Sequence, residues 1–393
     1  MPPLTCLPPS CRMALAGLRS QFKWDHFLIF SWLLVLQILN FGPGNLRTLS
    51  RMTSAISYDQ MTRFLKVSYN PNLWLLWLAQ RIFEHLPAPE NGIFFLKVDC
   101  TRKAKRSKRN PAIVKGKESS NGAWILGFQI LVVSAHWHTY RIPLLFALIR
   151  NKRDPAYQKP NDALVNLLKQ VPVPAWAKQV IVLADAGFSS KATFRQLQEW
   201  NWGYVMRLAR SWKLADGRKL ADIVTQTKDF QRIWIPSVNG KQRNTYHIHS
   251  LPTKLLHLGD VNLVIAKKRS HHGPKAVRVL VTNLTLEPKV ILAMYQRRWY
   301  VEVLFKELKG TVALGEHQVN SSFEQVERSV GMSLAAYLLL LRVLVKHIPD
   351  KGSWSAFELK RLFWQQTMGH FFHHFIHKEA KKHCHNLPSE IAS

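Results

Sequence analysis

The spacing of apolar residues divides the chain into a helical first part and a strand-rich middle part. Residues 20 to about 88 repeat apolar positions with the period of a helix, and the breaker Leu86-Pro-Ala-Pro-Glu-Asn-Gly92 ends this region. From residue 93 onward, short continuous apolar runs predict buried strands. Two of these runs, Ile93–Val98 and Val180–Ala184, are each followed directly by an aspartate. The pattern therefore predicts an α/β chain with an all-helical start.

Strand and helix signals alternate through the rest of the chain. In chain order they predict a hairpin at residues 124–134 and 139–148, helices at 161–170 and 190–200, a strand at 203–208, and β-like runs at 230–235, 244–248 and 261–265. A strand at residues 278–282 then returns to the main sheet. Pro288 marks the first turn of the next helix, where proline is favoured.

Within the helical start, residues 45–55 and 57–66 predict two short helices, with Ser57 as the N-cap of the second. This layout fits a helix-turn-helix whose second helix presents Arg63 to DNA. An ordinary helical hairpin explains the same pattern equally well.

Two apolar runs, residues 27–39 and Leu334–Val345, are shorter than the ~20 residues that cross a bilayer, and the second contains Arg342. Both predict buried helices. Residues 1–19 lack the charged start and apolar core of a secretion signal and predict a disordered leader, with Met13 as an alternative start.

One helical segment carries an unusual set of side chains. The run from Tyr295 to Lys309 contains no Gly or Pro and predicts an uninterrupted helix. At about 100° per residue, Arg298, Glu302 and Lys309 all fall on the same side as Tyr295. This stripe is either an exposed face with salt bridges or a metal ligand flanked by groups that hold a polyanion.

The two aspartates that follow buried strands favour the second interpretation. Asp99 and Asp185 end their strands at the edge of a sheet, where ligand sites form in α/β proteins. Each alone is explained as a turn residue. With Glu302 they supply three hard oxygen ligands of the kind that Mg²⁺ accepts, and two such ions about 3.5–4 Å apart assist phosphoryl displacement.

These residues resemble the signature of a large group of bacterial insertion-sequence transposases, the DDE transposases with a Tyr-x2-Arg-x3-Glu-x6-Lys motif. The first aspartate lies in the context Val98-Asp99-Cys-Thr101 and the second in Leu183-Ala-Asp185-Ala-Gly187-Phe188. All four signature positions are intact, and the resemblance spans about residues 93 to 345.

The resemblance implies a ribonuclease-H-like, retroviral-integrase-like α/β fold. It contains a mixed sheet with flanking helices, a β-strand insertion before the last catalytic acid, and an all-α N-terminal region. The expected organisation is a leader at 1–19, a helical region at 20–90, a catalytic domain at 91–210 and 276–347, an insertion at 211–275, and a basic, His-rich helical tail at 348–393.

The resemblance also implies a cytoplasmic, nucleoid-associated bacterial enzyme. Asp99, Asp185 and Glu302 would be the catalytic residues and would bind two Mg²⁺ ions, with Mn²⁺ as a substitute. The enzyme would cleave double-stranded DNA at the terminal inverted repeats of its element, and the freed 3′-hydroxyl would attack target DNA. A homodimer is expected, because two ends must be cut together.

Charge agrees with a DNA partner. The chain has 55 Lys+Arg against 24 Asp+Glu and a formal net charge of +31, which favours a polyanion. The basic residues that follow Asp99 predict a phosphate clamp. The full set of expected DNA contacts is Tyr295, Arg298, Lys309, Arg102, Lys103, Lys105, Arg207 and Arg63.

Two alternative functions remain open at this point. One is a ribonuclease-H-like nuclease that cuts without strand transfer, and the other is an inactive copy that only binds DNA. Cys100, next to Asp99, is interpreted as a small filler residue, because no partner for a nucleophilic thiol is visible.

Overall fold

The chain forms two compact units in the computed structural model. Residues 87–306 form one, the sheet unit, and residues 1–86 with 307–393 form the other, the helical unit. The structure describes residues 9–42, 44–105, 110–117, 123–137, 139–237, 242–316, 322–347 and 354–369.

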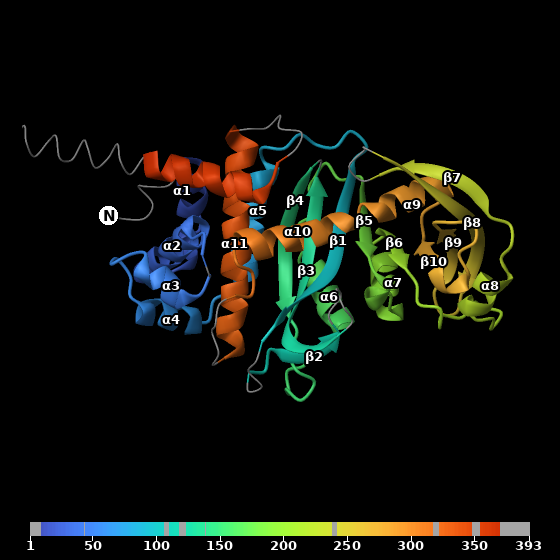
Figure 1. The fold of residues 1–393 in the computed structure, drawn as a ribbon, viewed down its shortest axis with the longest axis horizontal. Coiled ribbons are helices and arrows are strands. Elements are labelled where there is room, and N and C mark those ends of the chain that lie inside the picture. Colours follow the sequence, from blue (N-terminus) through green and yellow to red (C-terminus); the bar gives the residue numbers. More distant parts are fainter. Residues whose placement is uncertain are drawn as a thin grey trace, which may run out of the picture. The chain divides into compact units, whose positions relative to one another are not determined.

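Within the described residues, ten strands form one mixed sheet in the sheet unit (Figure 1). Its order is β2-β3-β1-β5-β6-β10-β9-β8-β7, with β4 paired to β3. The bounds are β1 Ile93–Ala104, β2 Ile113–Lys117, β3 Trp124–Trp137, β4 Tyr140–Leu148, β5 Gln179–Ala184, β6 Gly203–Arg207, β7 Gln231–Pro236, β8 Arg243–Leu255, β9 Gly259–Lys267 and β10 Arg278–Thr282. The predicted α/β class, with a mixed sheet and flanking helices, is confirmed.

The register between β1 and β5 decides where the two aspartates lie. These strands are parallel, and Val98 pairs with Ala184 in the last matched row. Asp99 and Asp185 are the next residues along the chain in each case, so they lie side by side where β5 ends. The prediction that Asp99 ends its strand is wrong, because β1 continues to Ala104 as the antiparallel partner of β3, and Asp99 is opposite Val132.

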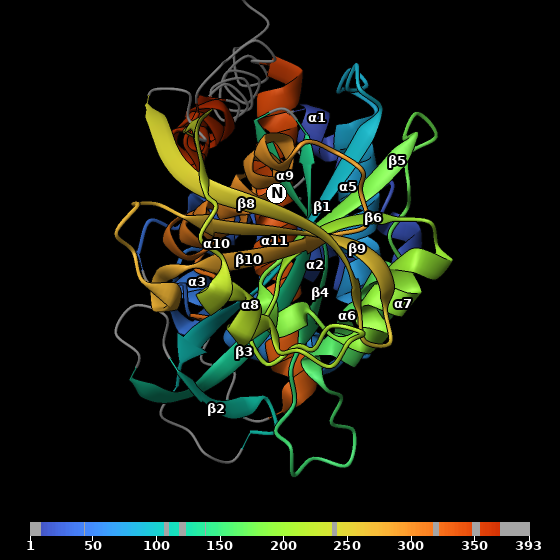
Figure 2. The same cartoon turned by 90° about the vertical axis from the view of Figure 1, so that its right-hand side faces the viewer.

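The β-like runs between Asp185 and Glu302 extend the same sheet. Strand β9 pairs antiparallel with β10, and β8 pairs antiparallel with β9, so these strands run side by side (Figure 2). A short helix, α8 (Leu220–Gln226), precedes them. In the described part of the sheet unit, helices α6 (Pro160–Leu168) and α7 (Lys191–Glu199) also precede the signature segment, Tyr295–Lys309.

Helix α9 (Pro288–Gln296) packs on one face of the sheet. Its residues Ile291, Leu292 and Tyr295 join a buried cluster with strand residues such as Ile181 and Val205. Burying these large side chains contributes roughly 1.5–3 kcal/mol each. The packing fixes the end of α9 above the sheet, next to the edge where Asp99 and Asp185 lie.

The prediction of one uninterrupted helix from Tyr295 to Lys309 is wrong. Helix α9 ends at Gln296, and a second helix, α10, runs from Trp299 to Thr311. Between them, the backbone N–H groups of Arg297 and Arg298 donate to carbonyls three residues earlier, on Met294 and Tyr295. This tighter winding brings residues three apart into alignment, so Tyr295 and Arg298 stay on one side.

The helical unit contains α1 (Pro9–Ala16), α2 (Trp24–Leu39), α3 (Leu46–Arg51), α4 (Tyr58–Lys66), α5 (Pro71–Phe83), α11 (Phe323–His347) and a helical segment at residues 356–369. The predicted cap is confirmed: Ser57 and Gln60 form a capping box at the start of α4. Residues 1–19 were predicted to form a disordered leader. This prediction is wrong for Pro9–Ala16, which form helix α1, with Ala14 and Leu15 buried.

Helix α11 is the long buried helix of this unit. Its segment Phe323–Lys346 is long and apolar enough to cross a membrane. However, 94% of an apolar 18-residue stretch within this segment is buried inside the protein. The prediction of a buried helix here is confirmed. The six histidines of the predicted tail lie outside the described residues.

Lys360 connects two helix ends within the helical unit. Its ammonium donates to the backbone carbonyls of Asn40, after α2, and Thr311, the last residue of α10. The side chain is 4% exposed, and burial lowers the pKa of Lys360 from 10.5 to about 8. Carbonyls at helix ends otherwise have no partner, and leaving such a group buried and unpaired costs about 1–3 kcal/mol.

We therefore expect Lys360→Met to lower the thermal midpoint, while Lys346→Met, at an exposed lysine, leaves it unchanged. The folded pKa lies below the unfolded value of 10.5, so between about pH 8 and 10.5 the unfolded chain holds more protons. Wild-type stability should then rise with pH relative to Lys360→Met across this window. Melting curves at pH 7.5, 9 and 10.5 test this, and a gap between the two proteins that narrows with pH would contradict it.

Candidate active site

A single arginine bridges two of the predicted acidic residues. The Arg298 guanidinium donates through Nη1 to Asp99 Oδ2 and through Nη2 to Glu302 Oε1, each at 2.7 Å. The Arg298 side chain is 16% exposed, against 21% for Asp99 and 37% for Glu302. Strand β1 and helix α10 therefore meet at a partly buried pair of charge-assisted hydrogen bonds, which are among the stronger kinds in proteins.

The third acidic residue is held by a tyrosine and an arginine. The Tyr295 hydroxyl donates to Asp185 Oδ1 at 3.3 Å, and Arg207 Nη1 lies 3.8 Å from the same oxygen. Tyr295 is 7% exposed, and its burial raises the pKa of this phenol to about 12. The phenol is thus a neutral hydrogen-bond donor near pH 7.

Charges couple all three carboxylates. Burial raises the pKa of Asp99, the Arg298 cation lowers it, and the Asp185 and Glu302 carboxylates raise it again. For Arg298, burial lowers the pKa, but Tyr295, Asp99 and Asp185 outweigh this effect, and the pKa lies above its ordinary value. The Arg298 cation therefore offsets the effect that the two neighbouring carboxylates have on Asp99.

The donor set suits Mg²⁺, which prefers hard carboxylate oxygens and keeps several waters. Within the described part of the chain, no group of three or more His, Cys, Asp or Glu side chains is placed so that it could hold a metal ion in this structure. The guanidinium of Arg298 lies between two of the acids instead. The three acids thus suit a divalent cation by their chemistry, while in this structure a guanidinium lies between Asp99 and Glu302.

Comparison with known proteins identifies the family. A family model described as a transposase DDE domain matches residues 99–339, more than half of the chain. The chain belongs to this family. The predicted function, a DNA transposase, is confirmed at this level.

No curated protein matches the chain. Among solved structures, the chain is similar to one described as a piggyBac transposase synaptic complex with hairpin DNA. The identity is 12%, the match covers 99% of this chain and 84% of that one, and the TM-score is 0.49.

The other side chains expected to contact DNA lie in different places in the transposase. Arg102 and Lys103 are on β1 beyond Asp99, and Arg102 donates to Gln129 at 3.2 Å. Lys105 follows the same strand, with its ammonium 5.2 Å from the Phe128 ring centre. Residues 106–109, which complete this basic run, lie outside the described residues.

The remaining predicted contacts lie on other elements. Arg207 ends β6 beside Asp185. Lys309 is in the last turn of α10, and Arg63 is exposed on α4 in the helical unit. Cys100 is partly buried, and desolvation raises the pKa of its thiol to about 12. A neutral thiol agrees with the interpretation of Cys100 as a filler residue.

A cationic cavity of about 430 Å³ lies against the signature segment. Tyr295, Arg298 and Trp299 form one side, and Lys267, Lys268 and Arg278 are among the residues that form the other. Trp299 is 55% exposed. Sequence reasoning missed these three cations, because nothing local to them signals that β9 and β10 bring them beside α10.

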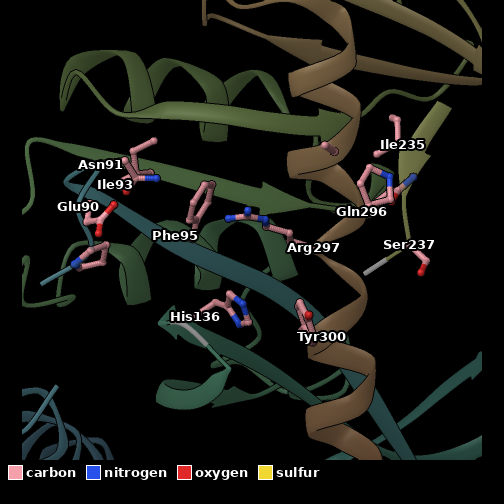
Figure 3. A pocket seen from close by; sticks show the side chains of 13 residues that line it. Glu90, Asn91, Ile93, Phe95, His136, Ile235, Ser237, Gln296, Arg297 and Tyr300 are labelled. Carbon is pink, nitrogen blue, oxygen red and sulfur yellow. Dashed lines mark hydrogen bonds between the residues drawn. The ribbon is translucent and has the colours of Figure 1, made fainter. Parts of the chain in front are cut away.

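A second cavity, of about 680 Å³, lies further along the sheet unit (Figure 3). Arg297 extends toward Phe95, with its guanidinium 5.4 Å from the ring centre, and His136 stacks on Tyr300 at 4.5 Å. None of the three predicted acids lines either cavity. Tyr295 and Arg298, which contact the acids, line the smaller cavity and not the larger one, so only the smaller cavity is connected to the carboxylate site through its lining.

Lys97 is a further buried cation of this region that was not predicted from the sequence. It is 1% exposed, and within the described residues its ammonium has no hydrogen-bond partner. The Nζ atom lies 4.5 Å from the Tyr300 ring centre. Burial, followed by Arg297, Arg141 and Arg298, lowers the pKa of Lys97 well below its ordinary value. The sequence does contain a signal for this buried lysine. Lys97 is the one charged residue in an apolar run, and it lies two residues before Asp99, so both are on the same face of the strand.

We expect Lys97→Met to stabilise the protein, because a polar group buried without a hydrogen bond costs free energy that methionine of similar shape does not incur. A gain of about 1 kcal/mol would raise the thermal midpoint by about 2–4 °C. Lys191→Met, at an exposed lysine of the same unit, should leave the midpoint unchanged. A fall in the midpoint of Lys97→Met would show that this ammonium makes a net stabilising contact.

Proposed function

We propose that this transposase cleaves DNA at the ends of an insertion sequence and joins the freed 3′-hydroxyl to target DNA, with Asp99, Asp185 and Glu302 as its metal ligands. One observation carries the proposal. The parallel register of β1 and β5, together with the start of α10, gathers three carboxylates around the guanidinium of Arg298. Membership in the transposase DDE family supports the same reaction.

Each acid has a distinct position in this proposal. Asp99 and Glu302 would share one side of the site, because the same guanidinium already spans them. Asp185 would complete the set from β5, with its Oδ1 oriented by the Tyr295 hydroxyl. When bound, a pair of Mg²⁺ ions would activate water or the 3′-hydroxyl and neutralise charge on the attacking and leaving oxygens.

The flanking side chains would hold the DNA backbone. Tyr295 and Arg298 line the cationic cavity, so a phosphate placed there would meet a phenol, a guanidinium and the ammonium of Lys268. Lys309 lies farther along α10 and would contact a second phosphate. Backbone contacts of this kind position DNA without reading its sequence.

Recognition of the element ends would fall to another part of the chain. Helix α4 presents Arg63 and Tyr58 on exposed positions after a capped start, as a recognition helix would. Arg102, Lys103, Lys105 and Arg207 would add phosphate contacts near the acids. The proposed setting is the bacterial cytoplasm, with two copies pairing two double-stranded ends.

Removal of one proposed ligand tests the catalytic assignment. Glu302→Gln, Asp99→Asn and Asp185→Asn should each lower cleavage of a duplex carrying the element end by more than about 100-fold, the upper range for residues that only support a metal ligand. Binding of the same duplex, measured by gel shift, should persist. Glu287→Gln, at the exposed N-cap of α9, is the matched control. Wild-type cleavage by Glu302→Gln would remove this residue from the mechanism.

The same assay separates a transposase reaction from simple cleavage. With Mg²⁺ and a target plasmid, the wild-type protein should yield joined products in addition to nicked ends. Nicked ends without joined products would assign the nuclease alternative.

Salt dependence tests the cationic cavity. Lys268→Gln or Arg278→Gln should reduce the slope of log K against log salt concentration by about 0.9 each, because one fewer phosphate is neutralised. Arg218→Gln removes an exposed arginine that pairs with Asp216 and should not change the slope. Equal slopes for all three variants and the wild type would show that DNA does not enter this cavity.

A further inference from the structure

Arg298 makes contacts that conflict with the role proposed for its two partners. Its two nitrogens each lie 2.7 Å from an oxygen proposed as a metal ligand, Asp99 Oδ2 and Glu302 Oε1. A magnesium ion binds carboxylate oxygens at about 2.0–2.1 Å. An ion held by both oxygens would need the space that the guanidinium fills, so the two cations cannot use these oxygens together.

Arg298 is also needed while no metal is bound. Arg298 and Asp99 are both partly buried, with 16% and 21% of their side chains exposed, and Glu302 binds the other arm of the guanidinium. An arginine stays charged in proteins and its planar fork matches two carboxylates. Arg298 thus supplies the positive charge that lies between Asp99 and Glu302 in the free protein.

The guanidinium needs a new anionic partner if it is displaced, because a buried, unpaired charge is costly. The same residue lines the cationic cavity with Lys268 and Arg278. A DNA phosphate entering that cavity would offer an acceptor within reach of the Arg298 side chain.

We propose that Arg298 holds the metal site closed in the free protein and exchanges partners when DNA arrives, releasing Asp99 and Glu302 to a divalent cation as it binds a phosphate. This inference rests on the proposed function and adds its regulation. Metal and DNA then strengthen the binding of each other, since each removes a contact that opposes the other. Free protein without DNA binds the metal weakly, which limits cleavage away from element ends.

The test measures Mn²⁺ binding to the full chain without DNA, by titration calorimetry and by the loss of the free Mn²⁺ electron-spin signal. Arg298→Met removes the competing cation and should bind Mn²⁺ at least about tenfold more tightly than Arg297→Met. The control removes the same charge from the preceding residue, whose guanidinium faces Phe95. Equal or weaker binding by Arg298→Met would overturn the exchange.

A separate outcome concerns the metal site itself. If Glu302→Gln abolishes Mn²⁺ binding but Arg298→Met does not change it, the metal ligands stand and only the exchange fails. If Mn²⁺ binds equally to wild type, Glu302→Gln and Asp99→Asn, the proposed metal ligands are wrong, and the exchange fails with them.

Folding of the variant is checked by melting with EDTA and with Mn²⁺. Arg298→Met should melt lower than Arg297→Met in EDTA, and Mn²⁺ should raise its midpoint more, because a tighter ligand stabilises the folded state more. Arg298→Lys provides a second test. A single ammonium does not span two carboxylates as a fork does, so its Mn²⁺ affinity should lie between those of wild type and Arg298→Met. Wild-type affinity in Arg298→Lys would contradict the exchange.

Discussion

Mutual repulsion among three carboxylates is the constraint on which the rest of this site depends. Asp99, Asp185 and Glu302 come from two neighbouring strand segments and a helix, and the charges of Asp185 and Glu302 raise the pKa of Asp99. The Arg298 guanidinium offsets this repulsion with two short ion pairs. Without this cation, Asp99 would lose the interaction that opposes the effects of burial and of the neighbouring carboxylates on its pKa.

The fold places these charges through a few local features. The parallel register of β1 and β5 fixes two aspartates on neighbouring strands. The tight turn between α9 and α10 keeps Tyr295 and Arg298 on the side that faces them. Packing of α9 on the sheet anchors this turn. The site therefore depends on backbone geometry that is largely set by buried apolar residues away from the charges.

Much of this arrangement could be predicted from the sequence because its signals are local. The apolar runs predict the buried strand that contains Asp99 and the one that precedes Asp185. The four-residue spacing of Arg298 and Glu302 predicts a contact that the structure contains. The break at Arg297 was not predictable in this way, because no Gly or Pro marks it. The helix α1 was missed because the prolines at the start of the chain suggested a leader.

Contacts between residues far apart in the chain could not be predicted from the sequence. Nothing near Lys268 or Arg278 in the sequence indicates that β9 and β10 pair and bring these cations next to Trp299. The ion pair between Asp99 and Arg298 joins residues 199 positions apart, and its existence depends on the whole sheet. The three acids could be predicted from the sequence. For Arg298, the sequence predicted only a contact with DNA and not the ion pairs with Asp99 and Glu302.

A structure of the transposase bound to a DNA end and Mn²⁺, with the metal located by anomalous scattering, tests the convergence of the three acids most directly. The expected result is Mn²⁺ at about 2.1 Å from oxygens of Asp99, Asp185 and Glu302, with the Arg298 guanidinium on a DNA phosphate. Mn²⁺ bound elsewhere, with Arg298 still bridging Asp99 and Glu302 in the DNA complex, would contradict it.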